Sequence, residues 1–256
     1  MKDILKLLVI FFSFTTVNSQ IILSNDTTIC SVQPFQLAAV SSTLDSLSTD
    51  DVYTGVQDIG FDFEFYGITY SKLLVSSNGY VTFDTTNASA WSIWGINAAI
   101  PNAGTEPENA IMCPWHDTDP NIGGVVYYGS FGIAPNRIYI VTWCALPMYS
   151  SLCNSLISTS QLLLYEGSNK IEMQIQDKPL CITHNGGAAI QGLVDATSTN
   201  FDIVTDPILG LPRNFPLTWA TTNEGWEFLP NGPTGYTINQ IPFQIPAVGT
   251  TTWHNE

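Results

Sequence analysis

Residues 59–83 read IGFDFEFYGITYSKLLVSSNGYVTF, and this stretch decides the fold. Phenylalanine occupies every second position from 61 to 65, with Asp62 and Glu64 in between. This two-residue period is that of a β-strand with one face on an apolar core and the other in water. Further along, Asn78-Gly79 precedes another apolar run, and this dipeptide tolerates the positive φ angles that a tight hairpin or a bulge requires. The stretch therefore predicts consecutive strands joined by tight turns.

The rest of the chain continues this pattern of short apolar runs separated by turn residues, and no segment after residue 19 shows a clear helical period. We predict an all-β fold, namely a jelly-roll-like β-sandwich stapled by disulfides. An edge strand is expected within 20–57 and a long irregular loop at 85–109. The strands expected after residue 84 are 110–115, 125–128, 137–144, 160–166, 170–177, 188–195 and one near 225–229.

The chain divides into three predicted parts. Residues 1–19 have the basic start, apolar centre and small-residue end of a secretory signal peptide. Residues 20–232 form the predicted sandwich. Residues 233–256 are rich in Pro, Gly, Thr and Asn, which indicates a linker or the start of a following domain. No run after the signal approaches the roughly 20 apolar residues that cross a bilayer, so we expect a secreted chain without membrane insertion.

The charge of the chain argues against several partners. Its formal net charge is −15, and of its seven Lys and Arg residues two lie in the signal peptide while the other five form no cluster. Nucleic acid and anionic membrane surfaces are therefore poor partners for this chain.

Five cysteines follow the signal peptide, which in an oxidising compartment predicts two disulfides and one remaining cysteine. Strand 137–144 leads into the loop that holds Cys153, and the next two strands run down the sheet and up again. Cys181 therefore emerges at the same end, and Cys153–Cys181 is the preferred pair. The spacing of the cysteines does not match a zinc site.

The other pairing stays open at this stage. Cys113–Cys144 is the second pair that we expect. Cys30 could replace either partner, stay free, or bond outside this segment.

The densest polar cluster of the sequence is His116-Asp117-Thr118-Asp119-Pro120-Asn121. Asp117 and Asp119, together with carbonyl oxygens, could bind calcium in a loop, because carboxylates at positions i and i+2 supply the hard oxygen ligands that this ion prefers. The alternative is an Asx turn that caps the end of a strand and binds no ion. No other cofactor is indicated.

Aromatic side chains in the 85–109 loop suggest a carbohydrate site. Trp91 and Trp94, together with Tyr149, could stack on sugar rings. The alternative is that these rings only close the ends of the sandwich. His184, before Asn185-Gly186-Gly187, could lie at the tip of a binding loop or be a solvated turn histidine.

No catalytic motif is present in the sequence. Four carboxylates, Asp117, Glu166, Glu172 and Asp195, could converge as the acid and base of a glycosidase, but their spacing does not favour it. GxSxG and HExxH are both absent. We therefore do not expect an enzyme.

Several strings, in order, carry a family resemblance. They are CSVQPFQL at 30–37, the stretch at 58–83, NAIMCPWHDTDPNIGGVVYYGSFGIAPNRIYIVTW at 109–143, LPMY at 146–149, QLLLYEGSNKIEMQIQDKPLC at 161–181 and RNFPLTWATTNEGWEFLPNG at 213–232. The chain resembles the N-terminal domain of large surface proteins of gliding Bacteroidota, which are exported by the type IX secretion system.

This resemblance implies a location, a partner and a role. The location is the cell surface of a Gram-negative bacterium, and the partner is the type IX secretion machinery. The role is that of a non-enzymatic module in adhesion or gliding motility, with surface glycans or abiotic surfaces as possible targets. The alternative hypothesis is a carbohydrate-binding module of a secreted polysaccharide-degrading enzyme, which the tryptophan-bearing loop motivates.

Overall fold

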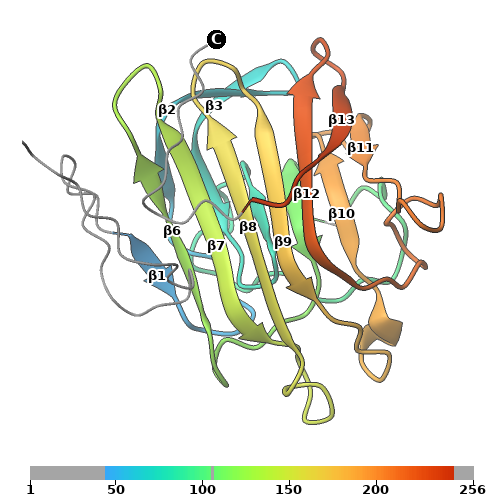
Figure 1. Cartoon of the computed structure of the whole chain (residues 1–256). Coiled ribbons are helices and arrows are strands. Elements are labelled where there is room, and N and C mark those ends of the chain that lie inside the picture. The colour runs from blue at the N-terminus through green and yellow to red at the C-terminus, as the bar shows by residue number, and fades with distance from the viewer. Residues whose placement is uncertain (1–43, 105–106, 245–256) are drawn as a thin grey trace, which may run out of the picture.

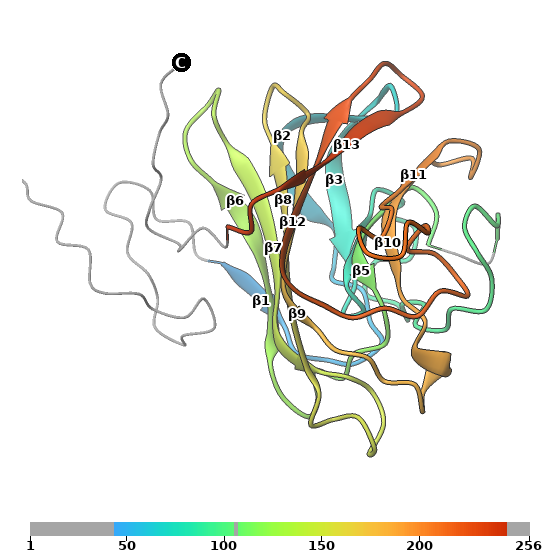
Figure 2. The ribbon, with the colours of Figure 1, turned by 45° about the vertical axis from the view of Figure 1, so that its right-hand side comes forward.

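The computed structural model describes residues 44–104 and 107–244, and within them it consists of two antiparallel β-sheets packed face to face (Figures 1 and 2). The predicted all-β sandwich is thus confirmed. The seven-stranded sheet has the order β1 (Asp45–Leu47), β6 (Val125–Phe131), β7 (Ile138–Pro147), β8 (Ile157–Tyr165), β9 (Ile171–Lys178), β12 (Thr221–Pro230) and β13 (Tyr236–Ile241). The six-stranded sheet has the order β11 (Phe201–Ile203), β10 (Ile190–Val194), β5 (Ala110–Trp115), β4 (Tyr80–Thr82), β3 (Ile68–Val75) and β2 (Gln57–Phe65).

The main core lies between the sheets, and the alternating phenylalanines of β2 point into it. Phe61, Phe63 and Phe65 are buried, whereas the residues between them are exposed. They pack with Trp143, Leu162, Trp226 and other apolar side chains of the opposite sheet. Burying each phenylalanine contributes about 1.5–3 kcal/mol. The two-residue period at the start of the stretch therefore places β2 correctly.

The six-stranded sheet is also covered on its outer face. Tyr80, Met112 and Ile190 pack there with Ile96 and Ile100 from the 85–109 loop. This loop therefore closes a second apolar layer, which explains why β5 is buried at every position.

The turn between β3 and β4 forms where Asn78-Gly79 predicts it. Gly79 has a φ of 82°. Its carbonyl oxygen accepts a hydrogen bond from the Cys113 amide at 2.8 Å, and the Asn78 carbonyl oxygen accepts one from the His116 amide at 3.2 Å. The turn is thus hydrogen-bonded to β5 and to the residue that follows this strand.

The structure changes some predicted boundaries. Strand β13 pairs with β12 from Gly225–Ile241 to Pro230–Tyr236, so the sheet continues past residue 232, where the sequence suggested a linker. The edge strand expected within 20–57 is present as β1, whereas the short edge strand β11 was not predicted. The predicted signal peptide and residues 20–43 lie outside the described residues. No helix in the part of the chain that the structure describes is long and apolar enough to cross a membrane.

The predicted Cys153–Cys181 disulfide is present, with its Cα atoms 5.9 Å apart. The second expected pair is wrong, because Cys113 is a free and buried thiol while Cys144 is disulfide-bonded. Cys113 lies on β5 among the residues between the sheets, and its thiol donates to the Gln161 carbonyl oxygen at 3.3 Å. Cys30 lies outside the described residues.

The Cys153–Cys181 bond joins the β7–β8 loop to the segment that follows β9, across 28 residues. Replacing both cysteines by serine should lower the free energy of unfolding by about 3 kcal/mol, because the unfolded chain then regains the entropy of an open loop. Urea denaturation of the two proteins measures this difference. An unchanged midpoint would mean that the bond does not constrain the unfolded chain.

A buried ionic cluster anchors the segment between β11 and β12. The Arg213 guanidinium lies 3.1 Å from Asp206 and 2.9 Å from Glu224, and it donates to Gln191 Oε1 at 2.7 Å. It also lies 4.1 Å from the ring centre of Trp219. The Arg213 side chain is almost fully buried, so these partners have to compensate the cost of removing its charge from water.

Candidate functional site

Loops from both sheets meet at one end of the sandwich. The β7–β8 loop and the segment around η1 (Asn185–Gly187) lie together at the lower end of Figure 1. The side chains of interest at this end are Asp50 and Asp51 after β1, Asn78 before β4, Trp91 and Trp94 in the 85–109 loop, Asp117 after β5, Tyr149 after β7, and His184 before η1. The disulfide joins two of these loops, so it also positions Tyr149 and His184.

Three carboxylates form the centre of this site. One oxygen from each of Asp50, Asp51 and Asp117 lies within 4.8 Å of the other two. We call these three residues the acidic cluster. Asp117 is brought in by β5, and its side chain is only 4% exposed.

Neighbouring side chains hold two of the carboxylates in place. His184 Nε2 lies 2.7 Å from Asp117 Oδ2, and the Asn78 amide donates to Asp51 Oδ1 at 2.9 Å. The His184 ring in turn contacts the rings of Trp94 and Tyr149, with centroid distances of 5.7 and 4.9 Å. These contacts fix the orientation of the acidic cluster.

The electrostatics of the site favour uncharged groups. Burial, followed by the charges of Asp51, Asp119 and Asp117, raises the pKa of Asp50 to about 7. Burial, with Asp51 and Asp119, raises the pKa of Asp117 to about 8. Burial also lowers the pKa of His184. Both the raised carboxyl pKa and the lowered imidazole pKa make the His184–Asp117 contact a hydrogen bond rather than a full ion pair at neutral pH.

Two oxygens of the acidic cluster have no partner among the described residues. Asp50 Oδ1 and Asp117 Oδ1 are both buried, and no described group hydrogen-bonds to them. A buried polar atom without a partner costs about 1–3 kcal/mol, and more if it is charged. Such oxygens need an explanation, which a bound group would supply.

The two residues of the predicted calcium pair have different environments. Asp117 joins the acidic cluster, whereas Asp119 Oδ1 accepts the Asn121 amide at 3.0 Å, as in an Asx turn. His116, predicted within the same polar group, turns into the interior beside Ser158, and burial lowers its pKa to about 3.

The aromatic residues of the predicted sugar site do lie together at this end. Trp91 is 57% exposed, Tyr149 is 39% exposed and Trp94 is half-buried against His184. Trp91 forms a β-bridge with Val52, next to Asp51, and the Ser92 amide donates to the Asp51 carbonyl oxygen at 2.8 Å. The aromatic and acidic candidates are therefore parts of one site.

Sequence reasoning missed Asp50, Asp51 and the role of His184. Asp51 and Asp117 are 66 positions apart, and no motif links them. The one available signal was the pair of adjacent aspartates in an otherwise uncharged stretch, followed by the tyrosine and glycine of a turn.

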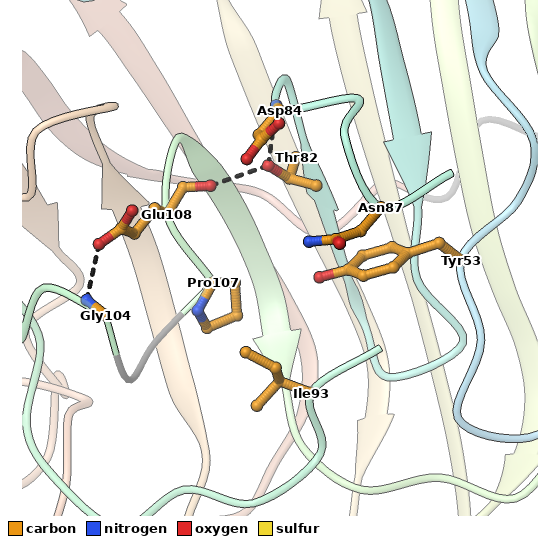
Figure 3. Close-up of a pocket in the computed structure, with 8 residues that line it drawn as sticks. All are labelled: Tyr53, Thr82, Asp84, Asn87, Ile93, Gly104, Pro107 and Glu108. Atoms are coloured by element: carbon orange, nitrogen blue, oxygen red, sulfur yellow. Dashed lines mark hydrogen bonds between the residues drawn. The ribbon is translucent and has the colours of Figure 1, made fainter. Parts of the chain in front are cut away.

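A small pocket lies elsewhere, beside the 85–109 loop (Figure 3), and has a volume of about 140 Å³. Its polar groups bond mainly to one another. Glu108 Oε1 accepts the Gly104 amide at 2.7 Å, and the Thr82 hydroxyl donates to the Glu108 carbonyl oxygen at 2.8 Å. Tyr53 directs its hydroxyl to that of Tyr80. The pocket is a weaker candidate than the acidic cluster because these groups are already satisfied.

Two packed antiparallel sheets, with a disulfide and a polar loop cluster at one end, define a β-sandwich module. The chain belongs to the NIDO-related family, whose model matches residues 28–210. Domains of this family are typically extracellular. No curated protein and no solved structure shows a significant match to the chain.

Proposed function

We propose that this chain is a non-enzymatic extracellular module through which a bacterial surface protein adheres to its surroundings. The observation that carries the proposal is the end of the sandwich where Trp91 and Tyr149 are exposed beside the acidic cluster. Exposed aromatic rings on loops held by a rigid scaffold are typical of recognition surfaces. Membership of an extracellular family supports the same reading.

The arrangement of the acidic side chains supports a role without catalysis. Glu166 is paired with Arg137, and Glu172 with Lys170. Asp195 accepts hydrogen bonds from residues 197, 199 and 200 of its own loop. Asp117 lies near the start of β8, because the neighbouring His116 contacts Ser158, whereas Glu166 follows the end of that strand. Glu172 is near Glu166 at the start of β9, and Asp195 lies beyond the start of β5 whereas Asp117 lies beyond its end. Asp117 is therefore at the opposite end of the sandwich from the other three carboxylates and forms no glycosidase pair with them.

The finer proposal is that the chain is the N-terminal part of an adhesin-like protein at the surface of a Gram-negative bacterium. The type IX secretion machinery would export it, and it would act in adhesion or gliding motility. The resemblance of the sequence strings supports this proposal. Fractionation of the source cells should recover the mature chain at the cell surface or in the medium. Recovery in the cytoplasm alone would contradict the proposal.

A second candidate function is that of a carbohydrate-binding module of a polysaccharide-degrading enzyme, which the exposure of Trp91 favours. Both functions use the same aromatic surface, but they differ in what accompanies it. A hydrolase domain in the same protein would support the second function, whereas repeats and a sorting domain would support the adhesin.

Changing Trp91 to alanine should weaken binding at least about tenfold, because the ring offers the largest exposed aromatic face at this end of the molecule. The measurement is the binding of beads coated with the mature chain, or with the variant, to glycan arrays, to glass and to hydrophobic surfaces. Phe201→Ala is the matched control, since Phe201 is an exposed aromatic residue (45%) on edge strand β11. Equal binding by the two variants, or no binding by the unmodified chain, would refute the proposal.

A further inference from the structure

We propose that the acidic cluster of Asp50, Asp51 and Asp117 binds one divalent cation, and that this cation is calcium. The proposal is independent of the adhesive role, because it concerns the ion that the loops hold and not the surface that they recognise.

The geometry of the cluster suits a calcium ion. The three carboxylate oxygens lie within 4.8 Å of one another. Oxygens that share a calcium ion lie about 2.3–2.6 Å from it, so two of them are separated by at most about 5 Å. Asp50 and Asp51 come from the turn after β1, whereas Asp117 comes from the end of β5. An ion at this point would therefore link the two sheets of the sandwich.

The second observation is the unsatisfied oxygen of Asp117. Its side chain is 4% exposed, and its Oδ1 has no hydrogen-bond partner among the described residues, although Oδ2 is held by His184. Asp50 Oδ1 is also buried, and no group in residues 44–104 or 107–244 hydrogen-bonds to it. Both are atoms of the acidic cluster, and water does not reach either of them freely. A cation would satisfy both oxygens at once, which no described side chain does.

The balance of charge points the same way. Three carboxylates meet here, and within residues 44–104 and 107–244 their one basic contact is His184. Asp119 lies near enough to act on Asp50 and Asp117 through its charge. A divalent cation would offset this concentration of acidic groups.

The donor set favours calcium over the other common metals. All three donors are carboxylate oxygens, which hard cations prefer, and the one nearby imidazole nitrogen is directed at Asp117. Zinc sites usually take nitrogen or sulfur ligands, and magnesium requires a nearly octahedral arrangement. With three protein carboxylates, we expect a dissociation constant of about 10⁻⁴ to 10⁻³ M, as in extracellular calcium modules.

The first test compares thermal unfolding of the mature chain with and without calcium. At 10 mM CaCl₂ the Tm should rise by about 3–10 °C for the expected affinity. Sodium chloride of equal ionic strength should not produce this rise. Asp117→Asn and Asp50→Asn should abolish it, whereas Asp62→Asn, a change of an exposed aspartate on β2, should preserve it.

The second test detects the ion directly. Terbium, added as TbCl₃, should show luminescence under tryptophan excitation because Trp91 bridges to Val52, next to Asp51, and Trp94 contacts His184. Calcium should displace it at a stoichiometry of one ion per chain. The folding control is the Tm of Asp117→Asn measured without calcium. If this Tm is equal to or higher than that of the unmodified chain without calcium, the variant is folded. Its loss of terbium luminescence then supports the site. An unmodified chain whose Tm is the same in calcium and sodium chloride, with luminescence equal to that of Asp117→Asn, would overturn the proposal.

Discussion

Replacing Arg213 by methionine should lower the free energy of unfolding by about 3–5 kcal/mol. The reason is that the substitution removes a positive charge from between two buried carboxylates. Asp206 and Glu224 are buried carboxylates that face the guanidinium at 3.1 and 2.9 Å, and both would lose their countercharge. Methionine fills much of the same volume and can still contact Trp219, so the loss would report the stranded charges more than a cavity.

The measurement is urea denaturation followed by tryptophan fluorescence. Arg137→Met is the matched control, because Arg137 pairs with Glu166 at the surface and its loss should change stability far less. Arg213→Lys should fall between the unmodified chain and Arg213→Met, since lysine keeps the charge but cannot reach both carboxylates with a planar fork. Equal losses for Arg213→Met and Arg137→Met would show that the buried cluster contributes no more than a surface pair.

Gly79→Ala should be about as damaging, with an expected loss of about 4 kcal/mol or more. A Cβ atom at this position would lie 2.0 Å from the Pro114 carbonyl oxygen, far inside contact distance. The backbone of β5 would have to move, although it is buried between two apolar layers. The positive φ of Gly79 adds about 1–2 kcal/mol for any residue with a side chain.

Gly167→Ala separates these two contributions. Gly167 also has a positive φ, of 74°, but a Cβ atom there meets nothing within 4 Å. Its loss of stability should therefore equal the conformational cost alone. If the two alanine variants have the same denaturation midpoint, the close contact between the β3–β4 turn and β5 is not present in solution.

Local patterns in the sequence predict the sheets and one disulfide of this molecule. The alternation around Phe63 needs only the residues of one strand, and it identifies the buried face of β2. The Cys153–Cys181 bond follows from counting strands, because two antiparallel strands return the chain to the end from which it left. Both arguments use neighbours in sequence, where geometry leaves little freedom.

The remaining features depend on contacts between distant segments. The sequence marked Asp117 and the loop of Trp91, but not Asp50 and Asp51, which approach them only after β1 joins the opposite sheet. The partners of Arg213 come from β10, from its own loop and from β12, and no periodic pattern relates them. Strand β13 was missed because turn-forming residues dominate the region around it.

The edges of the two sheets bear on how this module behaves when many copies are crowded together. Each sheet ends on one side in a strand of only three residues, β1 or β11. On the opposite edge of the six-stranded sheet, β2 directs Asp62 and Glu64 toward water. Short and negatively charged edges give a neighbouring chain little to pair with. These three edges are thus poor templates for strand addition when copies of the module are crowded together.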